Sequence, residues 1–180
     1  MLKPLVRTAL YFSLVLLAPR TLAQSVPPGF VDQSMITNLS NPVGCTWDAN
    51  GRMYIWQKGG QVRIYENGTL LPTLFMDISD EVANWRDHGL LGFALDPNFL
   101  ANGHVYALYG VDRHHLIPNG PYNPNTNVYF EATIMRITRF TAIQPGLNTV
   151  DPNSRLVLFG ESPSTGAPML HESHSTGQLV

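Results

Sequence analysis

The fold of this chain is decided by the stretch Trp85-Arg86-Asp87-His88-Gly89-Leu90-Leu91-Gly92-Phe93-Ala94-Leu95-Asp96-Pro97-Asn98-Phe99. A polar segment leads through Gly89 into an apolar run at 90–95, and Asp96-Pro97-Asn98 ends that run. An apolar run of this length between turn residues predicts a buried strand. Polar groups held at the mouth of a rigid strand are where a binding site can form.

The segment before this stretch alternates apolar and polar residues with a period of two, which excludes helices there. It predicts four short strands joined by tight turns, at residues 43–47, 52–57, 61–65 and 70–75. Short consecutive strands of this kind form an antiparallel meander of the size of one propeller blade. Trp47 and Trp56 are expected to fill the sheet and core, as large aromatics do in such folds.

The sequence of the first blade is partly repeated in the second. Residues 47–55 can be laid over 94–107, with a short insertion, and further strands are predicted at 133–141 and 155–159. The pattern predicts an all-β chain, a β-propeller of two blades, with residues 174–180 as the opening strand of a third. Because known propellers close with roughly four to eight blades, the chain is expected to be the N-terminal part of a longer protein.

Composition restricts the function classes. The chain has 180 residues, 44% of them hydrophobic and 13% charged, and a net charge of -2, which is a globular composition. Its lysines and arginines are scattered singly, so no basic face for nucleic acid is expected. Residues 112–129 and 161–173 have no strand periodicity and are predicted loops.

Residues 1–23 have the pattern of a signal peptide, with Lys3 and Arg7 before an apolar core at 10–18. That core is too short to span a bilayer, so a mature chain of residues 24–180, secreted or periplasmic and without a stable membrane span, is predicted. An uncleaved anchor is the alternative. The single Cys45 is expected to be a buried thiol or paired outside this chain.

Four groups of residues together carry a family resemblance, 89–99, 102–106, 136–140 and 174–179. They are similar to the soluble quinoprotein glucose/sorbosone dehydrogenases, a family that includes Hedgehog-interacting-protein-like propellers, and the likeness covers about residues 29–180. The resemblance implies a six-bladed propeller that binds pyrroloquinoline quinone (PQQ) and calcium on its axis. It also implies oxidation of a sugar, with hydride transfer to the quinone and an external electron acceptor.

The same resemblance implies roles for two residues. His174 takes the position of a general base on the sugar hydroxyl, a role that suits imidazole because its ordinary pKa of about 6.5 is close to working pH. Ser173 stands where the family often has an acid. Asp87 stands where Gln or Glu commonly contacts sugar or quinone. Most ligands of the quinone and calcium are implied to lie beyond residue 180, so the chain alone is expected to be inactive.

Other interpretations stay open beside this one. A non-catalytic ligand-binding propeller of the Hedgehog-interacting type is the main alternative, and a propeller hydrolase with an axial metal would need more axial acids than Asp87. No metal site is predicted, because His171 and His174 lack a third ligand at a recognisable spacing. The cluster at 112–115 is expected to be a solvated loop, since adjacent side chains of an extended segment point apart. His88 is interpreted as a packing or surface residue. Trp85 is interpreted first as a sheet and core residue, with stacking on a sugar as the alternative.

Overall fold

The computed structural model describes residues 26–117, 133–171, 173, 175 and 177–179. The expected signal peptide at 1–23 and the predicted base His174 lie outside the described residues. The chain divides into two units, Met1–Met35 and Ile36–Val180. In the first unit the described residues are exposed, and Phe30 N donates to Pro27 O at 3.0 Å. All described strands belong to the second unit.

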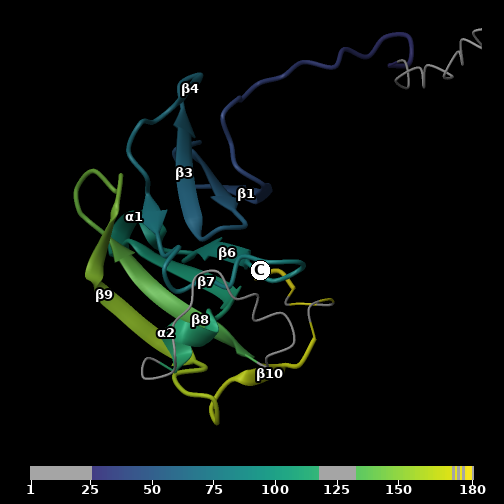
Figure 1. The fold of residues 1–180 in the computed structure, drawn as a ribbon. Coiled ribbons are helices and arrows are strands. Elements are labelled where there is room, and N and C mark those ends of the chain that lie inside the picture. The colour runs from purple at the N-terminus through teal and green to yellow at the C-terminus, as the bar shows by residue number, and fades with distance from the viewer. Residues whose placement is uncertain (1–25, 118–132, 172, 174, 176, 180) are drawn as a thin grey trace, which may run out of the picture. The chain divides into compact units, whose positions relative to one another are not determined.

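Two antiparallel sheets make up the second unit (Figure 1). The first contains β1 (Pro42–Trp47), β2 (Met53–Gln57), β3 (Gln61–Glu66), β4 (Thr69–Leu70) and β5 (Met76–Asp77). The second contains β6 (Leu90–Leu95), β7 (His104–Gly110), β8 (Thr133–Ala142), β9 (Val150–Phe159) and β10 (Ala167–Met169). Two short helices are described, α1 (Phe99–Asn102) and α2 (Arg113–Leu116). Each sheet is a meander that starts at an inner strand, β1 or β6, which confirms the prediction of an all-β chain built from two propeller blades.

The outer edge of the first sheet departs from the prediction of one strand at 70–75. β4 pairs with β3 at Tyr65, and β5 pairs with it at Val62, so two short pieces share one edge. Between them the chain contains Pro72, which has no N–H to donate to a ladder. The predicted fourth strand is therefore interrupted.

The second sheet repeats this arrangement at its outer edge. β9 pairs with β8 from Ile137 to Ala142, and β10 covers the remaining part of β8 at Thr133 to Met135. The stretch 161–173, predicted to be irregular, thus contains a strand. The reason is that β9 leaves the backbone groups at the start of β8 unpaired, and a second segment must satisfy them.

A repeated aspartate turn follows each inner strand and confirms the partial repeat of the sequence. Asp48 and Asp96 each accept a hydrogen bond from the backbone N–H two residues later, at 2.9 Å. Each also accepts one from a tyrosine on the next strand, Tyr54 Oη at 3.3 Å and Tyr106 Oη at 2.7 Å. The insertion in the second copy is α1, which ends at Gly103 in the left-handed conformation that glycine favours (φ 69°).

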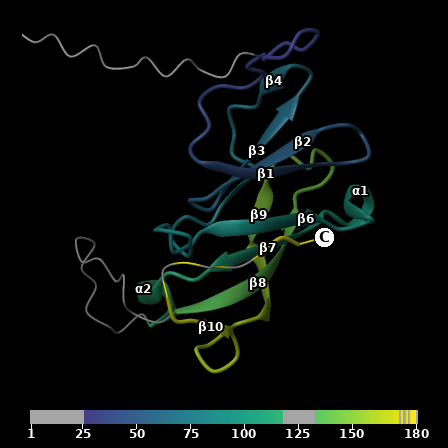
Figure 2. The same ribbon diagram turned by 90° about the vertical axis from the view of Figure 1, so that its right-hand side faces the viewer.

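The core joins the two sheets through aromatic side chains. Phe93 of β6 lies with its ring centroid 5.9 Å from Trp56 and 6.5 Å from Tyr54, both on β2. It also meets Phe75 edge-on at 6.2 Å. In Figure 2 the two sheets can be told apart, because β1 to β3 lie above β6 to β8. The face of β2 that carries Trp56 is therefore the face buried against the second blade.

The opposite face of β1 is exposed, which excludes the buried alternative for Cys45 and corrects the expected core position of Trp47. Cys45 is exposed and not buried, and Trp47 is 55% exposed and not part of the core. Both side chains alternate with Gly44 and Thr46, whose face of β1 is the half-buried one. At β1 the side chains of one face are therefore half-buried and those of the other are exposed.

None of the helices in the described ranges has the length and apolar character needed to cross a bilayer.

Candidate functional site

The two inner strands begin next to the same residue, Lys58, in the turn between β2 and β3. Lys58 N donates to Asn41 O, directly before β1, at 2.9 Å. Leu90 N, the first of β6, donates to Lys58 O at 2.8 Å. This turn is thus hydrogen-bonded to the starts of both inner strands. We call Lys58 together with residues 84–89 the mouth.

Two glycines of the Gly-Leu-Leu-Gly phrase make room for neighbouring segments. A Cβ at Gly89 would lie 2.6 Å from Lys58 Cγ and 2.8 Å from Lys58 O. A Cβ at Gly92 would lie 3.0 Å from Leu179 N and 3.2 Å from Gly177 O. Residues 177–179 therefore run close beside β6, where the first strand of a third blade is expected. Close approach of a neighbouring backbone explains the glycine at position 92, and at Gly89 the close contact with Lys58 is combined with a positive φ of 158°.

Replacing Gly89 by alanine is expected to lower the free energy of unfolding by about 1–3 kcal/mol, the usual cost of overpacking a tight contact. The new methyl group must displace the stem and the backbone of Lys58. Urea unfolding followed by tryptophan fluorescence measures the change. Gly177→Ala is the matched control, because nothing lies within 4 Å of its added Cβ. An equal effect of both changes would contradict the close-approach explanation.

Asp87 lies in an exposed turn at the mouth, closed by a hydrogen bond from His88 N to Trp85 O at 3.0 Å. Lys58 Nζ donates to Asn84 Oδ1 at 3.3 Å in the same region. Burial lowers the pKa of Lys58, and attraction to the Asp87 carboxylate partly offsets that change. The mouth therefore brings together an ammonium group, an amide and a carboxylate.

His88 is a packing residue, the first of the two roles expected from the sequence, and not a surface residue. It is 1% exposed, and its ring lies 4.6 Å from the Trp85 ring. His88 Nε2 is 2.9 Å from His171 O, and since a carbonyl can only accept, Nε2 is the donor. His88 therefore fixes the backbone at His171 beside the mouth.

The segment that contains His174 is described only in part. His171 is exposed, and its Nδ1 accepts a hydrogen bond from Ser173 N at 3.3 Å and lies 3.0 Å from Ser173 Oγ. His174 itself lies outside the described residues, so its role stays a prediction. Within the described ranges, no group of three or more His, Cys, Asp or Glu side chains is placed to hold a metal ion.

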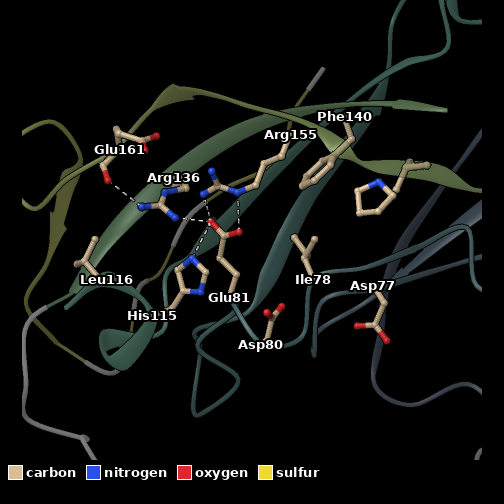
Figure 3. A pocket seen from close by; sticks show the side chains of 12 residues that line it. Asp77, Ile78, Asp80, Glu81, His115, Leu116, Arg136, Phe140, Arg155 and Glu161 are labelled. Carbon is tan, nitrogen blue, oxygen red and sulfur yellow. Dashed lines mark hydrogen bonds and ion pairs between the residues drawn. The ribbon is translucent and has the colours of Figure 1, made fainter. Parts of the chain in front are cut away.

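A second polar centre surrounds Glu81, in a pocket of about 570 Å³ (Figure 3). The Glu81 side chain is 5% exposed and forms ion pairs with Arg136 of β8 and Arg155 of β9. Arg155 Nη2 is 2.6 Å from Glu81 Oε1, and Tyr109 Oη donates to the same oxygen at 2.5 Å. Burial alone would raise the pKa of Glu81, but the hydrogen bonds from Arg155, Tyr109 and Arg136 outweigh it and lower the pKa to about 2.

This carboxylate was missed by sequence reasoning, although a signal was present. Arg136 alternates with apolar residues on the inward face of β8, between Ile134 and Phe140. A buried arginine requires an acidic partner. The sequence does not say which acid, because Glu81 lies 55 residues away. The arrangement uses Glu81 to tie the loop after β5 to three strands of the second blade.

The residues 112–115, expected to be a solvated loop, form the start of α2. Asp112 caps this helix by accepting hydrogen bonds from His114 N at 2.8 Å and His115 N at 3.3 Å. His115 Nε2 lies 3.7 Å from Glu81 Oε1, at the wall of the Glu81 pocket. The Asp112 carboxylate explains the helix, because it satisfies N–H groups that a helix start leaves unpaired.

The fold and the mouth define a class of protein, a β-propeller with polar residues where its inner strands begin. Residues 39–130 match the family model for glucose/sorbosone dehydrogenase. The chain belongs to this glucose/sorbosone dehydrogenase family, which confirms the resemblance seen in the sequence.

One curated relative is similar to the chain at 25% identity, and solved structures at lower identity share its fold. The chain is 25% identical over 158 residues to human Hedgehog-interacting protein, covering 84% of this chain and 20% of that protein. A crystal structure of a Thermus thermophilus oxidoreductase, described as a glucose dehydrogenase, matches with a TM-score of 0.56 and 22% identity, over 81% of this chain and 36% of the other. A second glucose dehydrogenase structure matches with a TM-score of 0.50 and 15% identity, over 71% of this chain and 32% of the other. The chain spans about a fifth of the length of the Hedgehog-interacting protein and about a third of these structures.

Proposed function

We propose that this chain is part of an exported, PQQ-dependent sugar dehydrogenase that oxidises an aldose hydroxyl. The observation that carries the proposal is the family match over residues 39–130, which includes the whole mouth. The lysine, amide and carboxylate of the mouth are groups that can bind sugar hydroxyls. Export rests on the signal pattern at residues 1–23.

In this proposal His174 removes the proton from the sugar hydroxyl, and Asp87 accepts a hydrogen bond from another hydroxyl. Imidazole can do this near neutral pH because its ordinary pKa is about 6.5. The hydrogen bond from His88 to His171 O holds the chain three residues before His174. Ser173, in place of an acid, can contribute a hydroxyl but no charge to this segment.

The described residues alone do not fit the quinone or its calcium ion. An anionic quinone needs several cationic partners, and the mouth holds Lys58 and Arg86 together with the opposite charge of Asp87. Calcium prefers six to eight oxygen ligands, and within the described ranges no group of three or more His, Cys, Asp or Glu side chains is placed to supply part of such a set. The groups that hold them are proposed to come from other parts of the protein, so only the roles of this chain's own residues are derived.

Replacing His174 by alanine is expected to lower kcat by about 10²–10⁴-fold, the usual contribution of a general base. The full-length protein is reconstituted with PQQ and calcium and assayed by dye reduction with aldoses. His171→Ala is the matched control, because it removes a nearby imidazole but keeps the carbonyl that accepts from His88. Full activity of the His174 variant would exclude this mechanism.

A non-catalytic, ligand-binding propeller of the Hedgehog-interacting type is the second candidate. It is favoured by the 25% identity to human Hedgehog-interacting protein over 84% of this chain. Asp87 and Ser173 also depart from the residues expected in a dehydrogenase, which favours the non-catalytic candidate. In the assay above, a folded wild-type protein that reduces no dye with any aldose would support this candidate.

A further inference from the structure

We propose that Lys58 is a sugar-binding residue, whose ammonium group donates to one hydroxyl oxygen while Asp87 accepts from an adjacent hydroxyl. The ligand class is a neutral sugar with neighbouring hydroxyl groups. The inference rests on the proposed function and deepens it, by adding a residue and a mode of recognition at the same mouth.

The backbone of Lys58 is fixed from both sides. Its N–H donates to Asn41 O at 2.9 Å, and its carbonyl accepts from Leu90 N at 2.8 Å. These bonds place Lys58 where both inner strands begin. A residue held on rigid strand ends is positioned more accurately than one on a free loop.

Because Gly89 has no side chain, the side chain of Lys58 can lie against the start of β6. An added Cβ there would lie 2.6 Å from Lys58 Cγ, so the lysine stem occupies the space that any other residue would fill. Asn84 Oδ1 then receives a hydrogen bond from Nζ at 3.3 Å. Gly89 therefore makes room for packing and also allows the ammonium group of Lys58 to reach the mouth.

The ammonium group has donors left for a ligand. An ammonium carries three N–H donors, and its hydrogen bond within the described ranges goes to Asn84. Asp87, an acceptor, lies three residues after Asn84, in the exposed turn that the bond from His88 N to Trp85 O closes at 3.0 Å. A donor and an acceptor held near each other match two adjacent hydroxyl groups, each of which both donates and accepts. A hydrogen bond from a charged donor is also stronger than one between neutral groups.

The test is titration of D-glucose and D-glucuronate into the quinone-free, full-length protein, followed by NMR or calorimetry. Lys58→Met, which keeps the stem and removes the donors, is expected to weaken the binding of both sugars about tenfold, as the loss of one charge-assisted hydrogen bond should. Lys58→Arg keeps the positive charge and N–H donors and is expected to bind both sugars more tightly than Lys58→Met. Arg63→Met is the matched control, because Arg63 Nη2 donates to Leu71 O and not at the mouth. Lys58→Gln replaces Lys58→Met if the latter fails to fold.

Three results would overturn the inference: no binding of glucose by the wild type, equal binding by the wild type and Lys58→Met, or a loss confined to glucuronate. The last would show that Lys58 binds a carboxylate instead of a hydroxyl. The titration needs no turnover, so its outcome is separate from the dehydrogenase proposal. A protein that binds glucose through Lys58 but never reduces the dye would contradict the proposed function alone.

Discussion

Glu81→Gln is expected to destabilise the protein by about 3–5 kcal/mol, the cost of breaking a buried ion pair from one side. The change leaves Arg136, which is 3% exposed, without the carboxylate that balances its charge. It also weakens the bonds from Arg155 and Tyr109. Chemical unfolding of the variant and the wild type measures the loss. Glu161→Gln is the matched control, since the exposed Glu161 lines the same pocket, accepts from Arg136 through its backbone carbonyl and affects Arg155 only through its charge.

The pH dependence of stability gives an independent check on Glu81. Its folded-state pKa of about 2 is below the ordinary value of 4.5, so the unfolded chain takes up the proton first as the pH falls. The contribution of Glu81 is therefore complete above about pH 4.5 and is lost between that pH and about 2. This loss should be absent from the Glu81→Gln variant. Parallel acid unfolding curves for the two proteins would contradict the ion-pair explanation.

Phe93→Ala is expected to cost about 3–5 kcal/mol, the range for truncating a buried phenylalanine. Phe93 is 2% exposed and contacts aromatic rings of the first blade from its place on β6. Its removal leaves a cavity between the two sheets. Trp56 is held on β2 and Phe75 in the loop between β4 and β5, so neither ring can move to fill the space. Thermal and urea unfolding measure the effect.

The control for Phe93 is Phe159→Ala. Phe159, on β9, is 41% exposed, so the same chemical change there removes little buried surface. We expect a change below about 1 kcal/mol, as is usual for surface substitutions. Similar losses for Phe93 and Phe159 would mean that the aromatic cluster does not hold the blades together.

The sequence predicted the strands whose pairing is local. The strands expected at 43–47, 52–57 and 61–65 appear within a residue or so of those bounds, because their alternation and tight turns determine hairpin register directly. The outer edges were not predictable in the same way. Whether a segment such as 167–169 becomes a strand depends on what β9 leaves unpaired on β8.

The candidate site was predictable only in part. The sequence located Asp87, through the resemblance, beside the start of β6, and its role remains a proposal. Lys58 was missed, since nothing in the turn Lys58-Gly59-Gly60 shows that its carbonyl accepts from Leu90. Contacts between blades join residues far apart in the chain, and a pattern of period two carries no information about them.

The aspartate turns have a consequence for the order of assembly. Asp48 and Tyr54 are six residues apart in the chain, and Asp96 and Tyr106 are ten apart, so each pair closes a small loop at low entropic cost. The bond from Arg155 to Glu81 closes a loop of 74 residues. We therefore expect the β1–β2 and β6–β7 hairpins to form early and independently, each carrying its own means of setting register, before the contacts between blades are made.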